Sequence, residues 1–285
     1  MSAVPKAQRP QASPYEGSAV TWQEPSVVES EEPTVRTALV RRPSPRLADG
    51  LVTHIDRTPV DAGLAARQHE AYVDALESAG WRVRELPAAD DLPDAVFVED
   101  TVVVCGGLAV LARPGASERR PEVESMEQAV AGLGLEVARI DGEGTLDGGD
   151  VLQVGTTVYV GRSGRTNEDA ICQLPRLLGT RGRHVVRVGL AGCLHLKTAM
   201  TALPDGTLIG NPDWVDTSVL PGLRVAPEPS GAHVVVLGEK QVLIAASAPR
   251  TAEQLRDEGY DVSVVDISEF EKMEGCVTCL SVLIP

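Results

Sequence analysis

The chain repeats one order of hydrophobic and polar segments: two strand-like stretches, an amphipathic helix and a third strand-like stretch. The clearest copy spans residues 100–140 and has a two-glycine turn between its first two strands. In its helix, spacings of three and four residues give one apolar stripe, formed by Val123, Met126, Val130 and Leu133. This copy predicts a ββαβ unit.

Three more stretches follow the same order, each with a glycine in the turn between its first two strands: residues 151–188, 194–225 and 233–265. Pro175 lies inside the helix expected in the first of these stretches, where it should kink or shorten that helix. In the second stretch only a short helix is expected, near residues 213–220. Three additional ββαβ units are therefore predicted, and the middle one has the weakest pattern.

The remaining segments lie toward the two ends of the chain: a strand at residues 35–40, a helix at 62–79, a strand at 82–86 and a C-terminal strand at 276–284. They make a fifth unit only if the first and last strands pair. Such pairing closes the sheets into a ring and removes the exposed edges that open units carry. We therefore predict an α/β fold, a five-bladed α/β propeller of ββαβ units around a central site. An open α/β sheet is the alternative.

Residues 1–33 have no hydrophobic period and contain five prolines among Ser, Gln and Glu. Such a segment buries too little apolar surface to offset its ordering entropy, so a disordered N-terminal extension is predicted. Residues 34–285 are expected to form a single α/β propeller domain, because a chain of this length supplies a hydrophobic core of its own.

Charge and cysteine content exclude several kinds of partner and location. Lys and Arg number 26 against 41 Asp and Glu, a net charge of −15, which argues against nucleic acid and anionic membranes as partners. No apolar run approaches the ~18 residues that span a bilayer, and the N-terminus lacks the apolar segment of a signal peptide. Five cysteines are too few, and odd in number, for a disulfide framework, so reduced thiols in the cytoplasm are expected.

A closed ring gathers equivalent strand starts around one central pocket. Chemically active side chains stand at those starts: Asp94, Glu99, Asp100, Asp147, Asp150, His195 and Cys279. Carboxylates, one imidazole and one thiol from distant positions can form a nucleophile, a base and an orienting group. His195 lies between two leucines on an expected strand, and Asp147 precedes paired glycines that permit close backbone approach. A plain turn at residues 145–150 is an equally good interpretation.

The spacing of Cys276 and Cys279 also matches redox and zinc motifs. A thioredoxin-like pair opens a helix, however, whereas residues 280–284 continue as a strand. A structural zinc site needs about four ligands, and no second Cys or His pair has matching spacing. On a strand, positions three apart point to opposite faces, so the two thiols are not expected to share one role. For Cys279, a small buried side chain without chemistry is the plainer alternative.

At these residues the sequence closely resembles the dimethylarginine dimethylaminohydrolases, members of the guanidino-group-modifying (pentein) superfamily. The matching stretches occur in the family's order and together cover nearly all of residues 35–285: residues 92–100, 113–116, 145–150, 165–167, 194–197 and 278–284. The resemblance implies a five-bladed propeller and a single catalytic domain over residues 34–285. It also implies hydrolysis of asymmetric dimethylarginine or monomethylarginine to citrulline plus dimethylamine or methylamine. No cofactor and no metal are implied, and the chain is expected as a monomer or homodimer.

The resemblance implies a role for each site residue. Cys279 is the nucleophile, His195 the general acid and base, and Asp147 the carboxylate that orients His195. The implied substrate-binding residues serve different parts of the substrate: Glu99 and Asp100 the guanidinium, Asp94 the α-amino group, Arg113 and Arg165 the α-carboxylate, and Leu51 and Met273 the walls of the pocket. These residue types suit the chemistry, because carboxylates and guanidinium groups form paired, charge-assisted hydrogen bonds.

The expected reaction is attack of the Cys279 thiolate on the guanidinium carbon, protonation of the departing amine by His195, and hydrolysis of a covalent thiouronium intermediate by water that His195 activates. Three alternatives remain. An arginine or agmatine deiminase of the same superfamily would release ammonia, although arginine-specific relatives tend to have an Arg where this chain has Glu99. A non-catalytic methylarginine-binding protein would need no nucleophile, and a redox protein would depend on Cys276.

Overall fold

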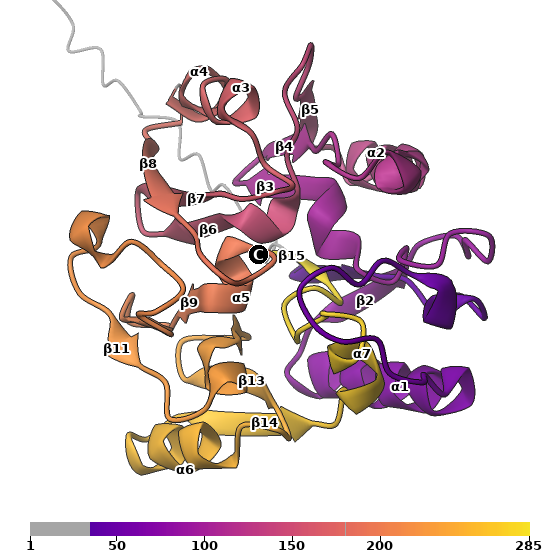
Figure 1. Cartoon of the computed structure of the whole chain (residues 1–285), viewed down its shortest axis with the longest axis vertical. Helices are drawn as coiled ribbons and strands as arrows, with labels where there is room; N and C mark the ends of the chain where they lie inside the picture. Colours follow the sequence, from indigo (N-terminus) through magenta and orange to yellow (C-terminus); the bar gives the residue numbers. More distant parts are fainter. Residues whose placement is uncertain (1–34, 180) are drawn as a thin grey trace, which may run out of the picture. The chain divides into compact units, whose positions relative to one another are not determined.

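The computed structural model describes residues 35–179 and 181–285, and the predicted extension, residues 1–33, lies outside this range. Within the described residues, the strands form five three-stranded mixed sheets arranged in a ring (Figure 1). In every sheet the inner and middle strands are antiparallel. The middle and outer strands are parallel. This is the order that the hydrophobic pattern predicts, so the five-bladed α/β propeller is confirmed.

The strands of each sheet take one of three places in the ring. The inner strands are β3 (Val102–Cys105), β6 (Val151–Val154), β9 (Met200–Ala202), β12 (Val234–Val236) and β15 (Val282–Ile284). The middle strands are β1 (Thr37–Val40), β4 (Leu108–Leu111), β7 (Thr157–Arg162), β10 (Leu208–Gly210) and β13 (Gln241–Ala245). The outer strands are β2 (Arg82–Glu85), β5 (Glu136–Arg139), β8 (His184–Gly189), β11 (Arg224–Val225) and β14 (Asp261–Val265).

Most helices lie on the periphery of the ring, in the connections between middle and outer strands (Figure 1): α1 (Ala62–Ser78), α2 (Val123–Ala131), α3 (Glu168–Ile171), α4 (Leu174–Gly179) and α6 (Pro249–Asp257). Two one-turn helices, α5 (Leu196–Ala199) and α7 (Ser268–Glu271), lead toward inner strands. Short 3₁₀ turns are η1 (Leu47–Asp49), η2 (Val98–Thr101), η3 (Ser117–Glu122), η4 (Gly148–Asp150), η5 (Thr217–Val219) and η6 (Pro229–Ala232). None of the helices in residues 35–179 and 181–285 combines the length and apolarity needed to cross a bilayer.

The two ends of the described chain close the ring. Strand β15 pairs antiparallel with β1, with Thr37 opposite Ile284 and Leu39 opposite Val282. Strand β1 pairs in turn with β2, its parallel outer neighbour. Because the last strand completes the first sheet, the predicted fifth unit is confirmed and the alternative of an open sheet is wrong.

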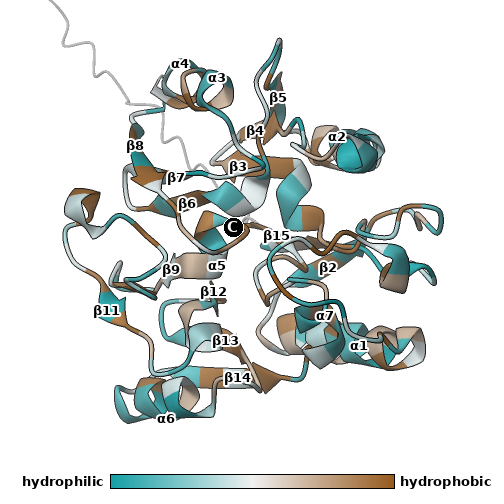
Figure 2. Ribbon diagram, in the orientation of Figure 1, coloured by the Kyte–Doolittle hydropathy of each residue, from teal (hydrophilic) through white to brown (hydrophobic). Residues whose placement is uncertain are grey.

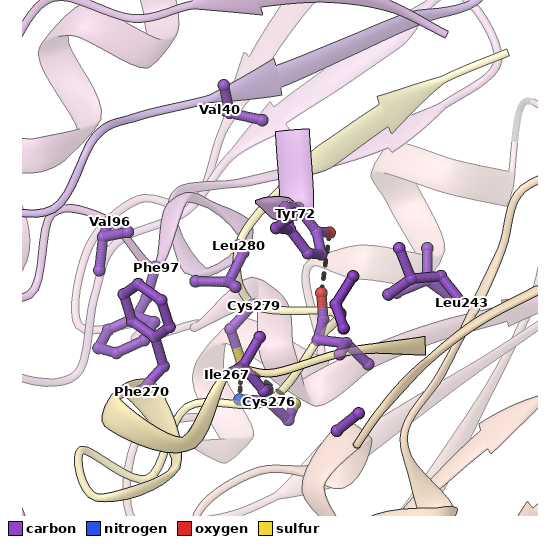
Figure 3. Packing of buried hydrophobic residues seen from close by; sticks show 14 of the residues in the cluster. Val40, Tyr72, Val96, Phe97, Leu243, Ile267, Phe270, Cys276, Cys279 and Leu280 are labelled. Carbon is purple, nitrogen blue, oxygen red and sulfur yellow. Dashed lines mark hydrogen bonds between the residues drawn. The ribbon is translucent and has the colours of Figure 1, made fainter. Parts of the chain in front are cut away.

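The hydrophobic core fixes the segment that precedes β15. Hydrophobic residues concentrate in the strands, whereas the peripheral helices α2 and α6 carry many hydrophilic residues (Figure 2). In one cluster, the rings of Phe97 and Phe270 meet edge to face with centroids 6.3 Å apart (Figure 3). The buried Tyr72 of α1 donates a hydrogen bond of 2.9 Å to the carbonyl oxygen of Val277. Burial of each such large side chain contributes about 1.5–3 kcal/mol, so α1 and this cluster hold the turn that carries Cys279 in place.

The predicted interruption of the helix around Pro175 is confirmed, whereas a second predicted helix is not formed. The helix expected around Pro175 is divided into α3 and α4, and Pro175 stands in the first turn of α4, where its missing N–H leaves no bond unmade. In the third unit, the helix predicted near residues 213–220 is only the 3₁₀ turn η5. Pro221 directly follows this segment and disfavours helical backbone at the residue before it.

Candidate active site

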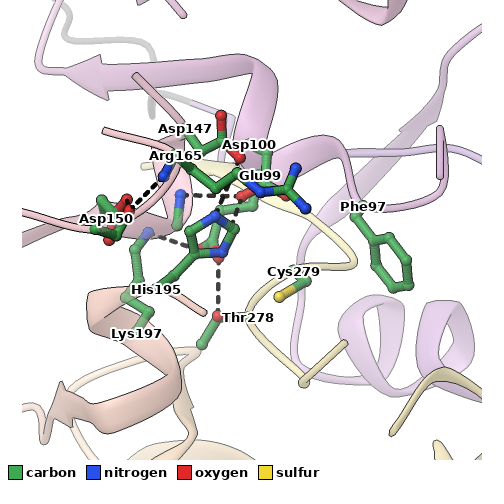
Figure 4. Close-up of polar contacts among 12 residues, drawn as sticks. Phe97, Glu99, Asp100, Asp147, Asp150, Arg165, His195, Lys197, Thr278 and Cys279 are labelled. Atoms are coloured by element: carbon green, nitrogen blue, oxygen red, sulfur yellow. Dashed lines mark hydrogen bonds and ion pairs between the residues drawn. The ribbon is translucent and has the colours of Figure 1, made fainter. Parts of the chain in front are cut away.

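The chemically active side chains lie in the turns that precede inner strands. Glu99 and Asp100 belong to η2 before β3, and Asp147 stands just before η4 and β6. His195 precedes α5 and β9, and Cys279 precedes β15 by three residues. The inner strands surround the axis of the ring, and Figure 4 shows the labelled side chains of their leading turns gathered in one place. The structure therefore brings together residues that are far apart in sequence.

Cys279 and His195 line one cavity. Both are buried, with exposed fractions of 7% and 3%. The other residues that line this cavity are Leu51, Asp94, Phe97, Asp100, Arg119, Arg165, Leu194, Met273, Glu274 and Gly275. Its volume is about 20 Å³, which is enough for roughly one water molecule. The other eight residues expected at a catalytic or binding position have different surroundings.

His195 is held by Asp147. The imidazole Nε2 lies 3.0 Å from Oδ2 of Asp147, whose side chain is fully buried. The other carboxylate oxygen of Asp147 accepts a hydrogen bond of 2.9 Å from the backbone N–H of Gly115. A buried carboxylate fixed in this way sets both the orientation and the tautomer of an imidazole. His195 is thus not on a strand, as the sequence pattern predicted: it is the residue before α5.

The carboxylates around His195 favour its charged form. Burial is the largest single influence and lowers the pKa of His195, but Asp100, Asp150 and Asp147 together outweigh it and raise the pKa to about 10. The Nδ1 atom lies 3.7 Å from Oδ1 of Asp100. At neutral pH His195 therefore carries a proton that it can donate to a departing group.

Two glycines allow the close packing at this end of the ring. A Cβ atom on Gly149 would lie 2.7 Å from Nδ1 of His195 and 2.8 Å from Oδ1 of Asp100. A Cβ atom on Gly115 would lie 2.4 Å from the carbonyl oxygen of Arg165. No side chain fits at either position without displacing these neighbours, so the predicted close backbone approach beside Asp147 is confirmed.

Arg119 and Asp100 form a buried ion pair beside the cavity. Their Nη1 and Oδ2 atoms are 2.5 Å apart, and Glu122 binds the same guanidinium through both of its oxygens. Burial acts to raise the pKa of Asp100, but His195 and Arg119 hold it below its ordinary value. Asp100 is therefore anionic and faces the cavity with a negative charge.

The two arginines that were predicted to bind the substrate have different surroundings in the structure. Arg165 lines the cavity, as expected of a substrate-binding residue. Arg113 does not line it, and its Nη1 donates a hydrogen bond of 3.1 Å to the carbonyl oxygen of Gly144. Arg119, six residues later, takes a place in the cavity wall instead. Sequence analysis missed Arg119, although it lies in the same arginine-containing segment.

Asp94, Leu51 and Met273 line the cavity beneath one exposed loop. Both carboxylate oxygens of Asp94 accept hydrogen bonds of 3.1 Å from the backbone N–H of Leu51. Burial raises the pKa of Asp94, while Arg119 and the N–H of Leu51 act to lower it. This loop, which we call the flap (residues 51–57), contributes Leu51 to the cavity wall.

Glu274 fastens the flap. Its carboxylate accepts hydrogen bonds from the backbone N–H groups of Thr53, His54 and Ile55 and from the Thr53 hydroxyl. The Glu274 side chain is only 4% exposed. Among residues 35–179 and 181–285, Glu274 is the one non-glycine residue with a positive φ, 60°. Such a conformation is unfavourable and persists where the surroundings impose it, here by the four hydrogen bonds.

Glu99 does not line the cavity of Cys279. One of its oxygens lies 2.6 Å from Nζ of Lys197, and the other accepts a hydrogen bond of 2.9 Å from the Thr278 hydroxyl. It borders a second, larger cavity of about 400 Å³, which is lined by all five inner strands and thus lies along the axis of the ring. Glu99 therefore acts on the neighbourhood of Cys279 through Thr278.

Cys279 lies in a turn, not on a strand. Its backbone N–H donates a hydrogen bond of 3.1 Å to the carbonyl oxygen of Cys276, and β15 begins only at Val282. The two sulfur atoms are 3.3 Å apart, so the prediction that they point to opposite faces is wrong. Contact with Cys276 raises the pKa of the Cys279 thiol, and burial and the carboxylates of Glu99 and Asp100 raise it further.

Three side chains are close enough together to be considered as metal ligands. Asp100, Asp147 and His195 each offer one atom, and these atoms lie within 4.8 Å of one another. However, the Arg119 guanidinium lies 2.5 Å from Asp100, and His195 itself carries a positive charge at neutral pH. Both cations repel a divalent ion, so this set suits a proton-transfer site better than a metal site.

Comparison with known proteins gives consistent results. A family model described as arginine deiminase matches residues 83–229. The chain is 56% identical over 248 residues to the N(G),N(G)-dimethylarginine dimethylaminohydrolase of Streptomyces coelicolor, covering 87% of this chain and 96% of that protein. It is 34% identical over 251 residues to the protein of the same name from Pseudomonas aeruginosa, covering 85% and 97%.

Solved structures show the same architecture. A mutant of the dimethylarginine dimethylaminohydrolase from Pseudomonas aeruginosa, complexed with citrulline, superposes with a TM-score of 0.81 at 33% identity. The match covers 87% of this chain and 98% of that one. The N-terminal domain of an arginine dihydrolase from cyanobacteria superposes with a TM-score of 0.78 at 20% identity, which shows a shared fold.

Proposed function

The chain belongs to the dimethylarginine dimethylaminohydrolase family and hydrolyses methylated arginine to citrulline, and from this premise we propose that Cys279, His195 and Asp147 carry the reaction. The observation that supports these roles best is the cavity that Cys279 and His195 share. The buried hydrogen bond from His195 to Asp147 completes a nucleophile, an acid and base, and an orienting group.

The first step breaks the bond between carbon and the methylated nitrogen. The substrate guanidinium brings a positive charge beside Cys279, which offsets the influence of the nearby carboxylates and favours the thiolate. The sulfur attacks the guanidinium carbon and forms an S–C bond. His195 gives its proton to the methylated nitrogen, and the C–N bond breaks to release dimethylamine or methylamine.

The second step releases citrulline. His195, now neutral, accepts a proton from water, and the resulting hydroxide attacks the carbon of the thiouronium intermediate. A C–O bond forms, the S–C bond breaks, and Cys279 is restored. Asp147 keeps the imidazole oriented through both steps, because its carboxylate is fully buried and fixed by the N–H of Gly115.

The walls of the cavity are proposed to bind the rest of the substrate. Asp100 faces the guanidinium, and Asp94 accepts the α-amino group beneath Leu51. For the α-carboxylate we propose Arg165, which lines the cavity, together with Arg113. Arg119 also lines the cavity, but its guanidinium is already bound by Asp100 and Glu122. Met273 remains a wall contact, and Glu99 is assigned to positioning Thr278.

Substrate entry requires the flap to open, since a cavity of about 20 Å³ does not hold an amino acid. Replacing Glu274 by glutamine removes the charge and turns one acceptor into a donor that faces backbone N–H groups. Hydrogen bonds to charged groups contribute about 1.5–3 kcal/mol each, so we expect the flap to be held less tightly and KM to rise about tenfold with kcat nearly unchanged.

Limited proteolysis tests directly whether Glu274 holds the flap. Trypsin should cleave after Arg57 faster in Glu274→Gln than in the wild type, because a released flap is accessible to proteases. The matched control is Glu77→Gln on the exposed face of α1, which should leave KM and cleavage unchanged. Equal KM values and equal cleavage rates in Glu274→Gln and wild type would contradict the role of Glu274.

Gly149→Ala should impair catalysis while the chain still folds. The added Cβ lies 2.7 Å from Nδ1 of His195, so the imidazole must shift, and a displacement of about 1 Å in a reacting group can cost 10²-fold in kcat. Gly222→Ala is the control, because its added Cβ has open space around it. Steady-state rates and thermal unfolding of both variants are to be compared. A wild-type kcat in Gly149→Ala would show that His195 needs no fixed position.

Product analysis tests the substrate class. The purified full chain is incubated with asymmetric dimethylarginine, monomethylarginine, arginine and agmatine, and citrulline and released amines are measured. We expect citrulline and dimethylamine from dimethylarginine, with little turnover of arginine or agmatine. Faster release of ammonia from arginine would favour a deiminase, and unchanged dimethylarginine after long incubation would favour a binding protein.

The compartment and the assembly are also proposals. All five cysteines lie in the described residues and are free thiols, which supports a reducing, cytoplasmic location. We further propose that the chain acts as a monomer or homodimer. Analytical ultracentrifugation of the full chain at several concentrations measures its oligomeric state.

A further inference from the structure

A second thiol lies beside the nucleophile and has no part in the proposed hydrolysis. The Sγ atoms of Cys276 and Cys279 are 3.3 Å apart (Figure 3). The backbone N–H of Cys276 also points at the Cys279 sulfur, at 3.4 Å. Among the described cysteines, this is the one pair whose sulfurs are in contact. The contact therefore needs an explanation of its own.

The backbone already has the geometry for a bond between these sulfurs. A turn joins the two residues, with the N–H of Cys279 donating to the carbonyl oxygen of Cys276 at 3.1 Å. Ends of such a turn have Cα atoms less than about 7 Å apart, which overlaps the range that disulfides require. A disulfide is about 2 Å long, so the two sulfurs need to approach by little more than 1 Å.

The two thiols differ in their access to the cavity. Cys279 lines it, whereas Cys276 is 2% exposed and is not among the lining residues. Hydrogen peroxide has two heavy atoms and no charge, so it is far smaller than an amino acid, and the carboxylate of Asp100 in the cavity wall does not repel it as it repels an anion. An oxidant that enters the cavity therefore meets Cys279 before it can reach Cys276.

We propose that Cys276 is a resolving thiol, and that Cys276 and Cys279 form a modification site which peroxides convert reversibly into a disulfide. This inference rests on the proposed function, in which Cys279 is the nucleophile exposed to the cavity. The disulfide stops hydrolysis, because the attacking sulfur is bound. It also protects the enzyme, because a sulfur in a disulfide is not carried on to the irreversible sulfinic acid.

The oxidation of the two thiols proceeds in two steps. The Cys279 thiol gives up its proton as its sulfur attacks one peroxide oxygen, the O–O bond breaks, and a sulfenic acid and one water, which takes this proton, are formed. The Cys276 sulfur then attacks the Cys279 sulfur, an S–S bond forms and the S–O bond breaks, and the hydroxyl group leaves as a second water with the proton of the Cys276 thiol. Two thiols are oxidised and one peroxide is reduced, and a dithiol reductant reverses the change.

The test reads the modification directly. The purified full chain is treated with a small excess of hydrogen peroxide, free thiols are blocked with iodoacetamide, and tryptic peptides are weighed. Cleavage after Lys272 gives one peptide, residues 273–285, that contains both cysteines. We expect this peptide to lose two hydrogens, and activity to disappear and then return fully with dithiothreitol. Saturating substrate or product during treatment should slow the change, because it fills the cavity.

Variants distinguish disulfide formation by Cys276 from oxidation of Cys279 alone. Cys276→Ser should keep most of its activity before treatment. With enough peroxide to carry a sulfenic acid on to the sulfinic acid, it should lose this activity and fail to regain it with dithiothreitol, its peptide gaining two oxygens at Cys279, whereas the wild type recovers after the same treatment. Cys172→Ser, at an exposed thiol, should behave as the wild type. If Cys276→Ser does not fold, Cys276→Ala and the wild-type peptide masses decide the question.

Two outcomes would overturn the inference: a wild-type peptide 273–285 without a disulfide after peroxide inactivation, or full recovery of Cys276→Ser with dithiothreitol. Neither outcome affects the proposed function, which fails instead if the Cys279→Ser variant still produces citrulline. The two failures are therefore distinguishable.

Discussion

Cys279→Ser should lower kcat/KM for asymmetric dimethylarginine by about 10⁴–10⁶-fold, the range expected when a covalent nucleophile is lost. A serine hydroxyl ionises far less readily than a thiol, and the surroundings of residue 279 do not help it. His195 carries a proton at neutral pH and cannot act as the base, and Asp100 faces the cavity with a negative charge. The measurement is the rate of citrulline formation at saturating and limiting substrate.

The substitution should leave the rest of the site intact. Serine is smaller than cysteine by little, and the backbone turn that places residue 279 depends on hydrogen bonds of the main chain. We expect Cys279→Ser to bind dimethylarginine in equilibrium measurements and to unfold at the wild-type temperature. Cys172→Ser should retain full activity. Residual turnover within tenfold of wild type in Cys279→Ser would assign the nucleophile to another residue.

His195→Ala should lower kcat by about 10²–10⁴-fold, the usual contribution of a positioned acid and base. The amine then departs without a proton, and water attacks without a base. The loss is expected to be greatest at neutral pH, where the wild-type imidazole is charged because its pKa is raised to about 10. Added imidazole should restore part of the rate. An unchanged kcat in His195→Ala would contradict this role.

The pH profile gives a companion test at Asp147. In the wild type, activity should fall as the pH rises through about 10 and His195 loses its proton. Asp147→Asn removes a negative charge that favours the protonated imidazole, so the alkaline limb of kcat should move to lower pH. A limb at the same or a higher pH would show that Asp147 does not set the charge of His195.

The ring could be predicted from sequence because each ββαβ unit is a local pattern. Four units were complete in the chain, and the strands left over at residues 35–40 and 276–284 implied the closure that β1 and β15 form. The meeting of Cys279 and His195 follows from that closure, since both precede inner strands. Periodicity thus carried information about the site as well as about the fold.

The details of the turns could not be predicted in this way. Residues 194–201 and 276–281 are short apolar runs, which fit a strand as well as a turn. In the folded chain, tertiary contacts select the helix α5 in the first run and the turn of Cys279 in the second. The contact between the sulfurs of Cys276 and Cys279 depends on that turn. Because a strand was predicted at these residues, the two sulfurs were expected on opposite faces.

Long-range ion pairs could not be predicted from the sequence either. Arg119 is buried because it meets both Asp100 and Glu122, and no local pattern distinguishes it from the exposed arginine beside it. Likewise, the hold of Glu274 on the flap joins residues about 220 positions apart. Such contacts arise from the fold as a whole, so they appear only once the blades are assembled.

The most direct test is to stop the reaction during turnover and locate the covalent intermediate. Enzyme and asymmetric dimethylarginine are mixed, quenched with acid within the first turnovers, and digested with trypsin. The expected result is substrate-derived mass on Cys279 in the peptide of residues 273–285, which disappears as citrulline accumulates. Such mass on any other residue, or citrulline formed with this cysteine unmodified throughout, would contradict catalysis by Cys279.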